Sequence, residues 1–145
     1  MSNYSSLSHT TWDCKYHVVF IPKCRRKALY YTLRKMLPEV LHELARQQGS
    51  KIEEGHMMPD HIHLLLSIPP KYSVSQVVGY LKGKSAIWIA RNVNGRKRSF
   101  YGQSFWARGY FVSTAGKDEM IVREYIRRQE EDDQKFDSSP RLPGM

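Results

Sequence analysis

Residues 60–68 are DHIHLLLSI, and large aliphatic side chains occupy every second position of this stretch. These are Ile62, Leu64, Leu66 and Ile68. Successive side chains of a β-strand point to opposite faces, so the four predict one apolar face that packs under other elements. His61 and His63 then share the opposite, open face. The stretch therefore predicts a half-buried strand that displays two imidazoles one pleat apart.

Strand and helix patterns on either side of this stretch predict one small domain. β-Branched and aromatic residues predict strands over 15–22, 51–57 and 105–113, in addition to 61–68. Apolar residues at helical spacing predict a helix over 33–45 that ends at Gly49, and a longer helix over 73–92 that Ser73 caps. The turn Met58-Pro59-Asp60 joins two of the strands as a hairpin. A last helix is expected from 114–117 to about residue 133.

The order of these elements, β-α-β-β-α-β-α, indicates the α+β class. The first six match the ferredoxin-like or RRM-like arrangement, a four-stranded antiparallel sheet with two helices on one face. The last helix is additional to that core and carries Tyr125. We expect one domain over residues 1–137 and a disordered tail over 138–145, where Pro, Gly and Ser are frequent.

The chain is strongly basic, with 23 Lys and Arg against 14 Asp and Glu, a net charge of +9 and a pI of about 9.7. This balance attracts polyanions and predicts salt-dependent affinity for nucleic acid, with an anionic membrane surface as the weaker alternative. No apolar run approaches the roughly 20 residues that a membrane span needs, and residues 1–9 are too polar for a signal peptide. Cys14 and Cys24 fit reduced thiols, because an extended strand between them holds them roughly 30 Å apart. We therefore expect a cytoplasmic protein that binds nucleic acid and does not enter a membrane.

The paired histidines predict a metal site. Two imidazoles one pleat apart can bind one ion through their neutral nitrogens, and Asp60 can orient one of them from outside the coordination shell. His56, at the end of the preceding strand, is expected to be structural or to support the ligands. Two alternatives stay open: a zinc hydrolase site made of His56, His61 and His63, and histidines that are incidental on a sheet surface.

The last predicted helix carries a candidate nucleophile, Tyr125, whose case rests on its pairing with the histidine strand. Tyr125 and Gln129 are four residues apart and so share one face of that helix. The side-chain oxygen of Gln129 can complete the shell of a metal bound by the two histidines, which brings Tyr125 beside the ion. Tyrosine is a poor nucleophile at neutral pH because its phenol titrates at about pH 10. A nearby cation favours the phenolate and polarises an attacked phosphate.

With these residues the chain resembles the small single-tyrosine transposases of bacterial insertion sequences, members of the HUH (His-hydrophobic-His) endonuclease superfamily. The HIH at 61–63 matches the HUH motif, and the YIxxQ at 125–129 matches the helix that carries the nucleophile. Further matches are TWxCKYHVVFxPKxRR at 11–26, GYLKGKS at 79–85 and FWxRGY at 105–110. The resemblance covers residues 8–134. A related group of chromosomal transposase-like proteins usually has Asn-Pro where this chain has Gln129-Glu130, which favours the insertion-sequence group.

The resemblance implies a DNA transposase that works by transesterification. It implies that Tyr125 attacks a phosphate in single-stranded DNA and leaves a 5′-phosphotyrosine and a free 3′-OH. A divalent metal, Mg²⁺ or Mn²⁺, would be held by His61, His63 and Gln129. It also implies recognition of hairpins at the ends of the element, and a homodimer whose active sites are shared between chains. The basic candidates for DNA contact are Lys23, Arg25, Arg26, Lys27, Lys82, Lys84, Arg96, Lys97, Arg98 and Arg108.

Two rival functions follow from the same sequence. One is a non-catalytic, RRM-like binder of RNA or DNA, which should show aromatic stacking residues on its central strands. The third predicted strand has His61 and His63 there instead. The other is a metal-dependent hydrolase that forms no covalent adduct with DNA.

Overall fold

The structure is an α+β fold built on one four-stranded antiparallel sheet. It is a computed structural model and describes residues 5–7, 10–23, 27–92, 105–115, 123–128 and 131. The strands of the sheet are β3 (Lys15–Phe20), β4 (Lys51–Met58), β5 (His61–Ser67) and β6 (Phe111–Thr114). The helices are α1 (Lys27–Gln47) and α2 (Val74–Asn92). A separate antiparallel hairpin is formed by β1 (Ser5–Leu7) and β2 (Thr10–Trp12).

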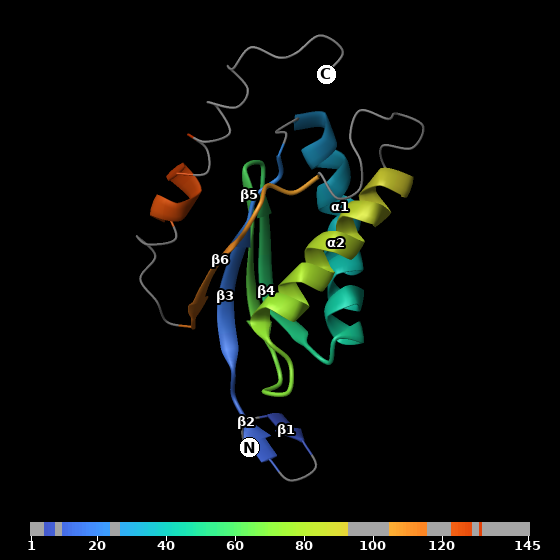
Figure 1. Ribbon diagram of the computed structural model, residues 1–145. Helices are drawn as coiled ribbons and strands as arrows, with labels where there is room; N and C mark the ends of the chain where they lie inside the picture. Colours follow the sequence, from blue (N-terminus) through green and yellow to red (C-terminus); the bar gives the residue numbers. More distant parts are fainter. Residues whose placement is uncertain are drawn as a thin grey trace.

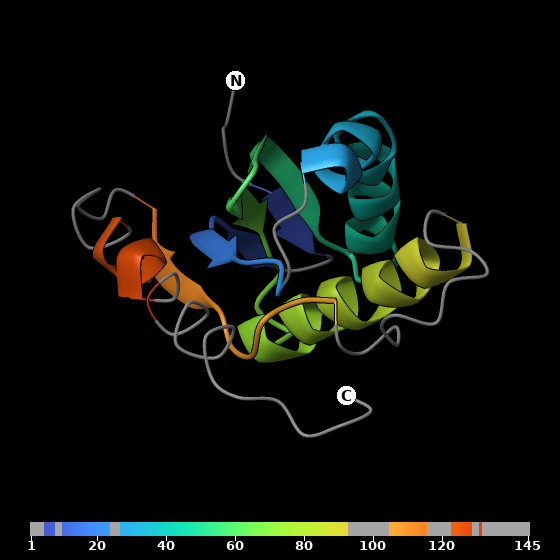
Figure 2. The ribbon, with the colours of Figure 1, turned by 90° about the horizontal axis from the view of Figure 1, so that it is seen from above.

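The strands are arranged in the order β4-β5-β3-β6, and each neighbouring pair is antiparallel. Both α1 and α2 cover one face of this sheet, whereas the helical residues 123–128 lie beside β6 on the side away from them (Figures 1 and 2). The β1–β2 hairpin extends from the start of β3 (Figure 1). This is the ferredoxin-like order, so the predicted fold class is confirmed.

The core lies between the sheet and the two helices. Ile62, Leu64 and Leu66 of β5 keep 2%, 3% and 0% of their surface exposed. Against them α1 packs a stripe of every fourth residue, which comprises Leu33, Leu37, Leu41 and Ala45. Each large aliphatic side chain buried in this way contributes about 1.5 to 3 kcal/mol to folding. The core face of β5 is the one that the alternation of its side chains predicted.

One end of each helix is the predicted one. The Ser73 hydroxyl accepts a hydrogen bond of 3.0 Å from the backbone N–H of Gln76, which confirms the N-cap of α2. At the other end of α1, Gly49 has φ +63°, a conformation that side chains disfavour. Its N–H donates to the Arg46 carbonyl at 3.0 Å, and the next N–H donates to the Ala45 carbonyl at 2.9 Å. These two bonds form a Schellman cap, so the predicted stop at Gly49 is confirmed.

A β-bulge in β4 sets which side chains face the core. The register of β4 against β5 shifts between Ile52 and Glu54. Ile52 is buried in the core, and the extra residue moves the following even-numbered side chains to the opposite face. His56 therefore pairs with His63 on the open face instead of following Ile52 into the core.

The predicted strand over 105–113 is wrong at its beginning. Residues 105–110 make only an isolated bridge, between Pro22 and Trp106, and β6 begins at Phe111. Trp106 is buried, and its indole N–H donates to the Ser85 hydroxyl on α2 at 3.0 Å. The aromatic run therefore packs against α2 instead of pairing in the sheet. The chain then turns at Gly109, with φ +73°, before it joins the sheet.

Other elements also differ from the prediction. Strand β3 ends at Phe20, two residues before the predicted end. Helix α1 begins at Lys27, ahead of Leu33, where the predicted apolar pattern starts, and it continues through Pro38. The β1–β2 hairpin was not predicted, because its polar segments lack apolar alternation. Of the predicted last helix, 123–128 are helical, and most of its remaining residues lie outside the described ones.

Neither of the long helices among the described residues is apolar enough along its length to cross a bilayer. The expected cytoplasmic location and the single domain over 1–137 stay predictions. The predicted tail over 138–145 lies outside the described residues.

Candidate active site

One row of side chains crosses all four strands on the face of the sheet that α1 and α2 do not cover. In this row His56 pairs with His63, His63 with Val19, and Val19 with Phe111. Paired residues of antiparallel strands point to the same side, so all four share the open face. His61 is one pleat from His63 and lies on this face as well. The fold thus brings the two predicted ligands together on one surface.

His61 is oriented by its neighbour in the hairpin turn. The Asp60 carboxylate oxygen Oδ1 lies 2.9 Å from Nδ1 of His61. A carboxylate accepts, so Nδ1 of His61 carries a hydrogen, and in the neutral form of the ring Nε2 is the nitrogen with the lone pair. Met58 pairs with His61, so only a two-residue turn separates the strands and holds the carboxylate in place. The contact is the one that the predicted role of Asp60 requires.

His63 contacts a second imidazole, from β3. Nδ1 of His17 lies 3.1 Å from Nε2 of His63, and the ring centroids are 5.2 Å apart. Burial lowers the pKa of His63, and the neighbouring His17, His61 and His56 lower that pKa further. At neutral pH His63 is therefore uncharged, which is the form that binds metals. His17 was not among the predicted site residues.

The three-histidine zinc site is not formed. The His56 ring is exposed, and its Nε2 lies 3.0 Å from the Glu54 carboxylate instead of facing the other two histidines. Within the described ranges, no group of three His, Cys, Asp or Glu side chains is arranged to hold a metal ion. A ligand set built on His61 and His63 therefore needs a donor from elsewhere.

The central strands also lack the features of an RRM-like binder. On their open face, β3 and β5 place His17, Val19, His61, His63 and Leu65. This set contains no Phe, Tyr or Trp on which a base could stack, so the RRM-like alternative loses its main support.

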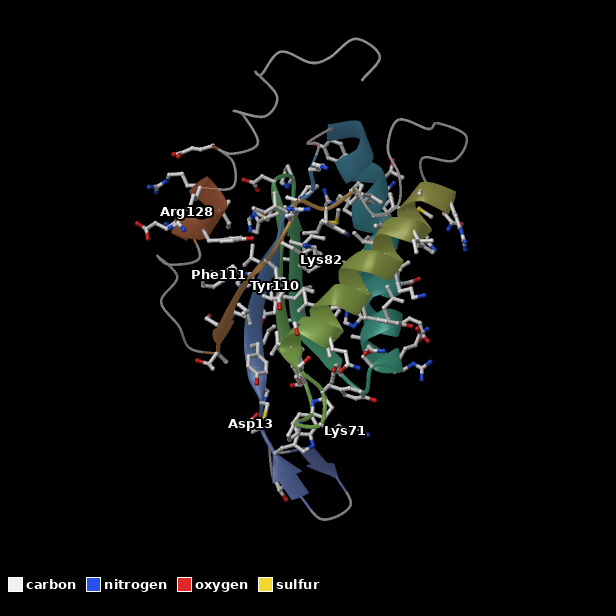
Figure 3. All side chains as sticks on the ribbon, in the orientation of Figure 1. Asp13, Lys71, Lys82, Tyr110, Phe111 and Arg128 are labelled. Atoms are coloured by element: carbon white, nitrogen blue, oxygen red, sulfur yellow. The ribbon has the colours of Figure 1, made fainter. Side chains whose placement is uncertain are left out.

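Tyr125 lies at the β6 edge of the same face. Its ring packs on Phe111 with centroids 5.4 Å apart and planes inclined by 45°. Phe111 belongs to the row described above, two strands from His63, which corresponds to about 10 Å at the usual strand spacing. Figure 3 shows Phe111 on β6 and Arg128 on the neighbouring helical residues. Gln129 lies outside the described residues, so its predicted place beside the histidines stays a prediction.

Basic residues flank the histidine end of the sheet. The Lys23 N–H donates to the Phe105 carbonyl at 2.8 Å, and the Ala107 N–H donates to the Ile21 carbonyl at 2.7 Å. These bonds join the segments of Lys23 and Arg108, both exposed, at the end of β3 that pairs with the start of β5. Of the other predicted DNA contacts, Lys84 is exposed on α2 and Lys27 begins α1. Five more lie outside the described residues: Arg25, Arg26, Arg96, Lys97 and Arg98.

Lys82, another predicted DNA contact, binds backbone carbonyls inside the protein. Its ammonium donates to the carbonyls of Ala107 and Gly109 at 2.9 Å and 2.6 Å, and it lies 6.0 Å from the centre of the Tyr110 ring (Figure 3). Burial lowers the pKa of Lys82 to about 8. Two of its three donors are used inside the protein, so Lys82 ties α2 to the segment that leads into β6.

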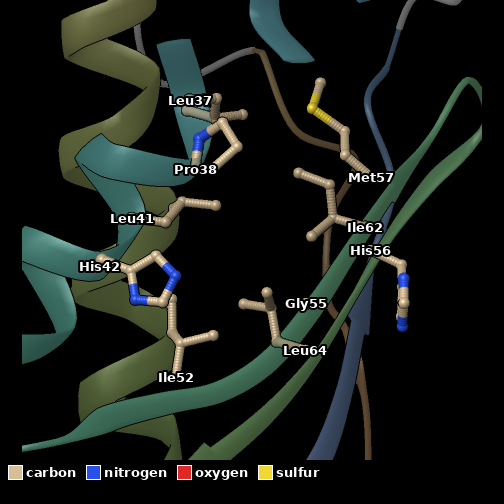
Figure 4. Close-up of a pocket in the computed structure, with 10 residues that line it drawn as sticks. All are labelled: Leu37, Pro38, Leu41, His42, Ile52, Gly55, His56, Met57, Ile62 and Leu64. Carbon is tan, nitrogen blue, oxygen red and sulfur yellow. The ribbon is translucent and has the colours of Figure 1, made fainter. Parts of the chain in front are cut away.

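The pocket on the other side of the sheet is not the reaction site. It measures about 70 Å³ and lies between α1 and β4–β5, where Leu41, Ile62 and Leu64 line it (Figure 4). That volume accommodates roughly two water molecules. In Figure 4 the His56 ring is directed away from it. This pocket is a packing gap of the core, and the polar chemistry lies on the open face.

The histidine pair, the tyrosine helix and the sheet all fall inside a single family match. The family model described as "Transposase IS200 like" matches residues 10–129. The chain belongs to this family. It is therefore a DNA transposase, a DNA-cleaving enzyme.

Two relatives of this transposase are similar over most of their length. It is 44% identical over 133 residues to the transposase for insertion sequence element IS200 of Salmonella typhimurium, a match that covers 92% of this chain and 88% of the relative. It is 29% identical over 119 residues to the ISDra2 transposase TnpA of Deinococcus radiodurans, which covers 81% and 85%. The predicted kinship with insertion-sequence transposases is confirmed.

Two solved structures share the fold of the transposase. One, from Deinococcus radiodurans and also described as a transposase, has a TM-score of 0.69 at 24% identity and covers 89% of this chain and 97% of its own. The other is a REP-associated tyrosine transposase bound to a REP hairpin, with a TM-score of 0.53 at 15% identity and coverage of 84% and 68%. At these identities they show the fold.

The Lys82 contact predicts a pH dependence of stability. The folded pKa of about 8 lies below the ordinary 10.5, so the unfolded chain binds more protons between these values. The free energy of unfolding should therefore rise as pH increases from 8 to 10.5. In Lys82→Met this rise should be absent, and the variant should be less stable because two carbonyls lose their donor. Urea unfolding of both proteins across this pH range measures the difference, and parallel pH profiles would contradict the assignment.

Proposed function

We propose that this IS200-like transposase cleaves and rejoins single-stranded DNA through a covalent phosphotyrosine on Tyr125. The observation that carries the proposal is the shared face. Tyr125 packs on Phe111, which belongs to the same row of the sheet as His63. Family membership supplies the DNA-cleaving function, and the open face supplies a tyrosine and two imidazoles with which to perform it.

The proposed reaction proceeds in two displacements at phosphorus. The phenolate oxygen of Tyr125 forms a bond to the scissile phosphorus, and the bond from phosphorus to the 3′ oxygen breaks. This leaves a 5′-phosphotyrosine and a 3′ oxygen, which takes up a proton to become a free 3′-OH. A 3′-OH from another DNA end then attacks the phosphotyrosine, joins the strands and releases the phenolate. One phosphoester is made for each one broken, so the reaction needs no nucleotide cofactor.

The donor set fits a divalent cation. Asp60 leaves Nε2 of His61 with its lone pair, and the lowered pKa of His63 keeps that ring neutral. Gln129 would add an oxygen ligand from the nucleophile helix. Imidazole nitrogens suit Mn²⁺ better than Mg²⁺, which prefers shells of oxygen alone. When bound, the cation supplies positive charge that polarises the phosphate and favours the phenolate.

The proposed substrate is DNA with hairpin ends. One solved relative of the same fold is a tyrosine transposase bound to a hairpin. Lys23 and Arg108 are exposed at the end of the sheet that carries His61, where they can bind phosphates beside the reacting strand. Affinity for hairpin DNA should therefore decrease with salt.

Replacing the nucleophile tests the covalent step. Tyr125→Phe should abolish the protein–DNA adduct on a denaturing gel, because the ring that packs on Phe111 is retained and only the hydroxyl is lost. Hairpin binding should be unchanged. Tyr80→Phe is the matched control, since it loses a hydroxyl that donates to Gln47 on the other layer of the fold, and it should form the adduct normally. An adduct that persists in Tyr125→Phe would assign the nucleophile to another residue.

Removing either imidazole tests the metal site. His61→Ala and His63→Ala should each weaken Mn²⁺ binding by at least about tenfold, since loss of even an outer partner has an effect of this size. Both should also abolish cleavage. The fold should survive, because the buried side chains of β5 are untouched. His56→Ala, which removes an exposed ring paired with Glu54, should bind Mn²⁺ normally. Cleavage that persists in EDTA and in the double variant would refute a metal-dependent mechanism.

We further propose a homodimer whose two active sites are shared between chains. Each chain offers one nucleophile, while moving an element requires two ends to be cut, and twofold pairing is the commonest way to supply two copies. In this structure the Tyr125 ring is seated on Phe111, two strands away from His63 of the same chain. Helical residues 123–128 lie outside the sheet–helix core, so serving the partner's histidines would leave that core intact (Figure 2).

Complementation tests the sharing. Tyr125→Phe and His63→Ala chains are each expected to be inactive. If sites are shared, a mixed dimer rebuilds one intact site from the two, and partial cleavage should return on mixing under conditions of subunit exchange. Recovery is not possible when each chain uses its own tyrosine. An inactive mixture despite demonstrated exchange, or a monomer by sedimentation, would refute the shared dimer.

A further inference from the structure

His17 contacts the proposed ligand His63 from the neighbouring strand. Nδ1 of His17 and Nε2 of His63 are 3.1 Å apart, and the two ring planes are inclined by 46°. Val19 is the direct partner of His63 in the sheet, so His17 is its diagonal neighbour, a spacing that long and aromatic side chains can bridge. Both rings are half-buried. The separation is that of a hydrogen bond, so one proton lies between the two nitrogens.

Only one placement of this proton is compatible with metal binding by His63. A neutral imidazole has one N–H and one lone pair. If Nδ1 of His17 donates, Nε2 of His63 accepts and its Nδ1 carries the hydrogen, so neither nitrogen of His63 is left for a metal. If Nε2 of His63 donates, its Nδ1 keeps a free lone pair. Donation from His63 is therefore the tautomer that a ligand needs.

We propose that His17 is a positioning residue of the metal site, which accepts a hydrogen bond from Nε2–H of His63 and so presents Nδ1 of His63 to the cation. The proposal rests on the proposed function, in which His63 is a ligand. Asp60 supports His61 in the same way through Nδ1. Ligating histidines commonly donate their second N–H to such a partner, and loss of the partner weakens metal affinity about 10- to 100-fold.

Direct ligation by His17 fits the contacts less well. It would require His17, His61 and His63 to surround one point, and no set of three such side chains in the described part of the chain is arranged in that way. A His17 Nδ1 that accepts the proton of His63 also has its lone pair occupied. The contact therefore favours support of a ligand over a third ligand.

Two substitutions separate hydrogen bonding from packing. His17→Leu keeps an apolar body of similar size but removes the acceptor, whereas His17→Asn keeps an acceptor oxygen near the position of Nδ1. Titration of the full-length protein with Mn²⁺, followed by the electron paramagnetic resonance of the free ion, measures affinity. His17→Leu should bind about 10-fold more weakly or worse, and His17→Asn should recover most of that loss. Equal affinity of wild type and His17→Leu would overturn the proposal, as would equal loss in both variants.

The tautomer of His63 gives an independent readout. Long-range ¹H–¹⁵N correlation spectra of metal-free protein with ring-labelled histidine distinguish Nδ1–H from Nε2–H, and the His63→Ala spectrum assigns the signal. His63 should be protonated at Nε2 in the wild type and in His17→Asn. An Nδ1–H tautomer in the wild type would overturn the proposal, even if His17→Leu failed to fold.

Failure of the proposed function would have a different signature. Mn²⁺ affinity that is unchanged in His63→Ala would refute the metal site itself. Mn²⁺ binding that depends on His63 but not on His17 would refute only the role of His17. Spin-echo spectra of bound Mn²⁺ count the imidazole nitrogens that coordinate the ion. A third such nitrogen that disappears in His17→Leu would show that His17 is itself a ligand, and this result would also overturn the proposal.

Discussion

The register of β5 between β3 and β4 is the constraint on which the site depends. Because side chains alternate along a strand, a slip of one residue would turn His61 and His63 into the core and expose Ile62 and Leu64. The strand is hydrogen-bonded on both sides, so a slip would have to break both ladders at once. The buried aliphatic face thus determines where the imidazoles lie. In β4 the bulge after Ile52 has a similar effect, because it brings His56 to the open face while Ile52 stays in the core.

The helix layer also influences the open face, although it covers the opposite one. Lys82 on α2 holds the backbone of Ala107 and Gly109, which lie just before β6. Trp106 adds a second tie through its bond to Ser85. The first residue of β6 is Phe111, against which the Tyr125 ring packs. Interactions on the far side of the sheet therefore help to set where the Tyr125 ring lies.

Much of the fold could be predicted because period-two and helical patterns are local. Strands β4 and β5 and helix α2 match the predicted ranges within one residue, and β3 is shorter than predicted by two. Residues 105–110 were wrongly assigned to a strand because an aromatic run looks the same whether it pairs in a sheet or packs on a helix. Trp106 packs on Ser85, a partner that the local sequence does not reveal. The start of α1 was missed although Leu29 lies four residues before Leu33 and continues the same spacing.

The site residues, too, could be predicted only where a local sequence pattern places them. The shared face of His61 and His63 follows from alternation in one strand, and Asp60 is adjacent in sequence. His17 becomes a neighbour of His63 only through the register of β3 against β5, which no local pattern reveals. The internal contacts of Lys82 were missed as well, since a lysine in a basic motif gives no sign that its ammonium binds backbone carbonyls.

The pairing of β3 with β6 joins the beginning of the chain to its last quarter. During synthesis the histidine hairpin emerges early, yet the strand that seats the Tyr125 ring begins more than forty residues after β5 ends. A nascent or truncated chain can therefore carry both histidines while it still lacks Tyr125, the proposed nucleophile. Under the proposed mechanism, such a chain cannot by itself form a covalent bond to DNA until the polypeptide is almost complete.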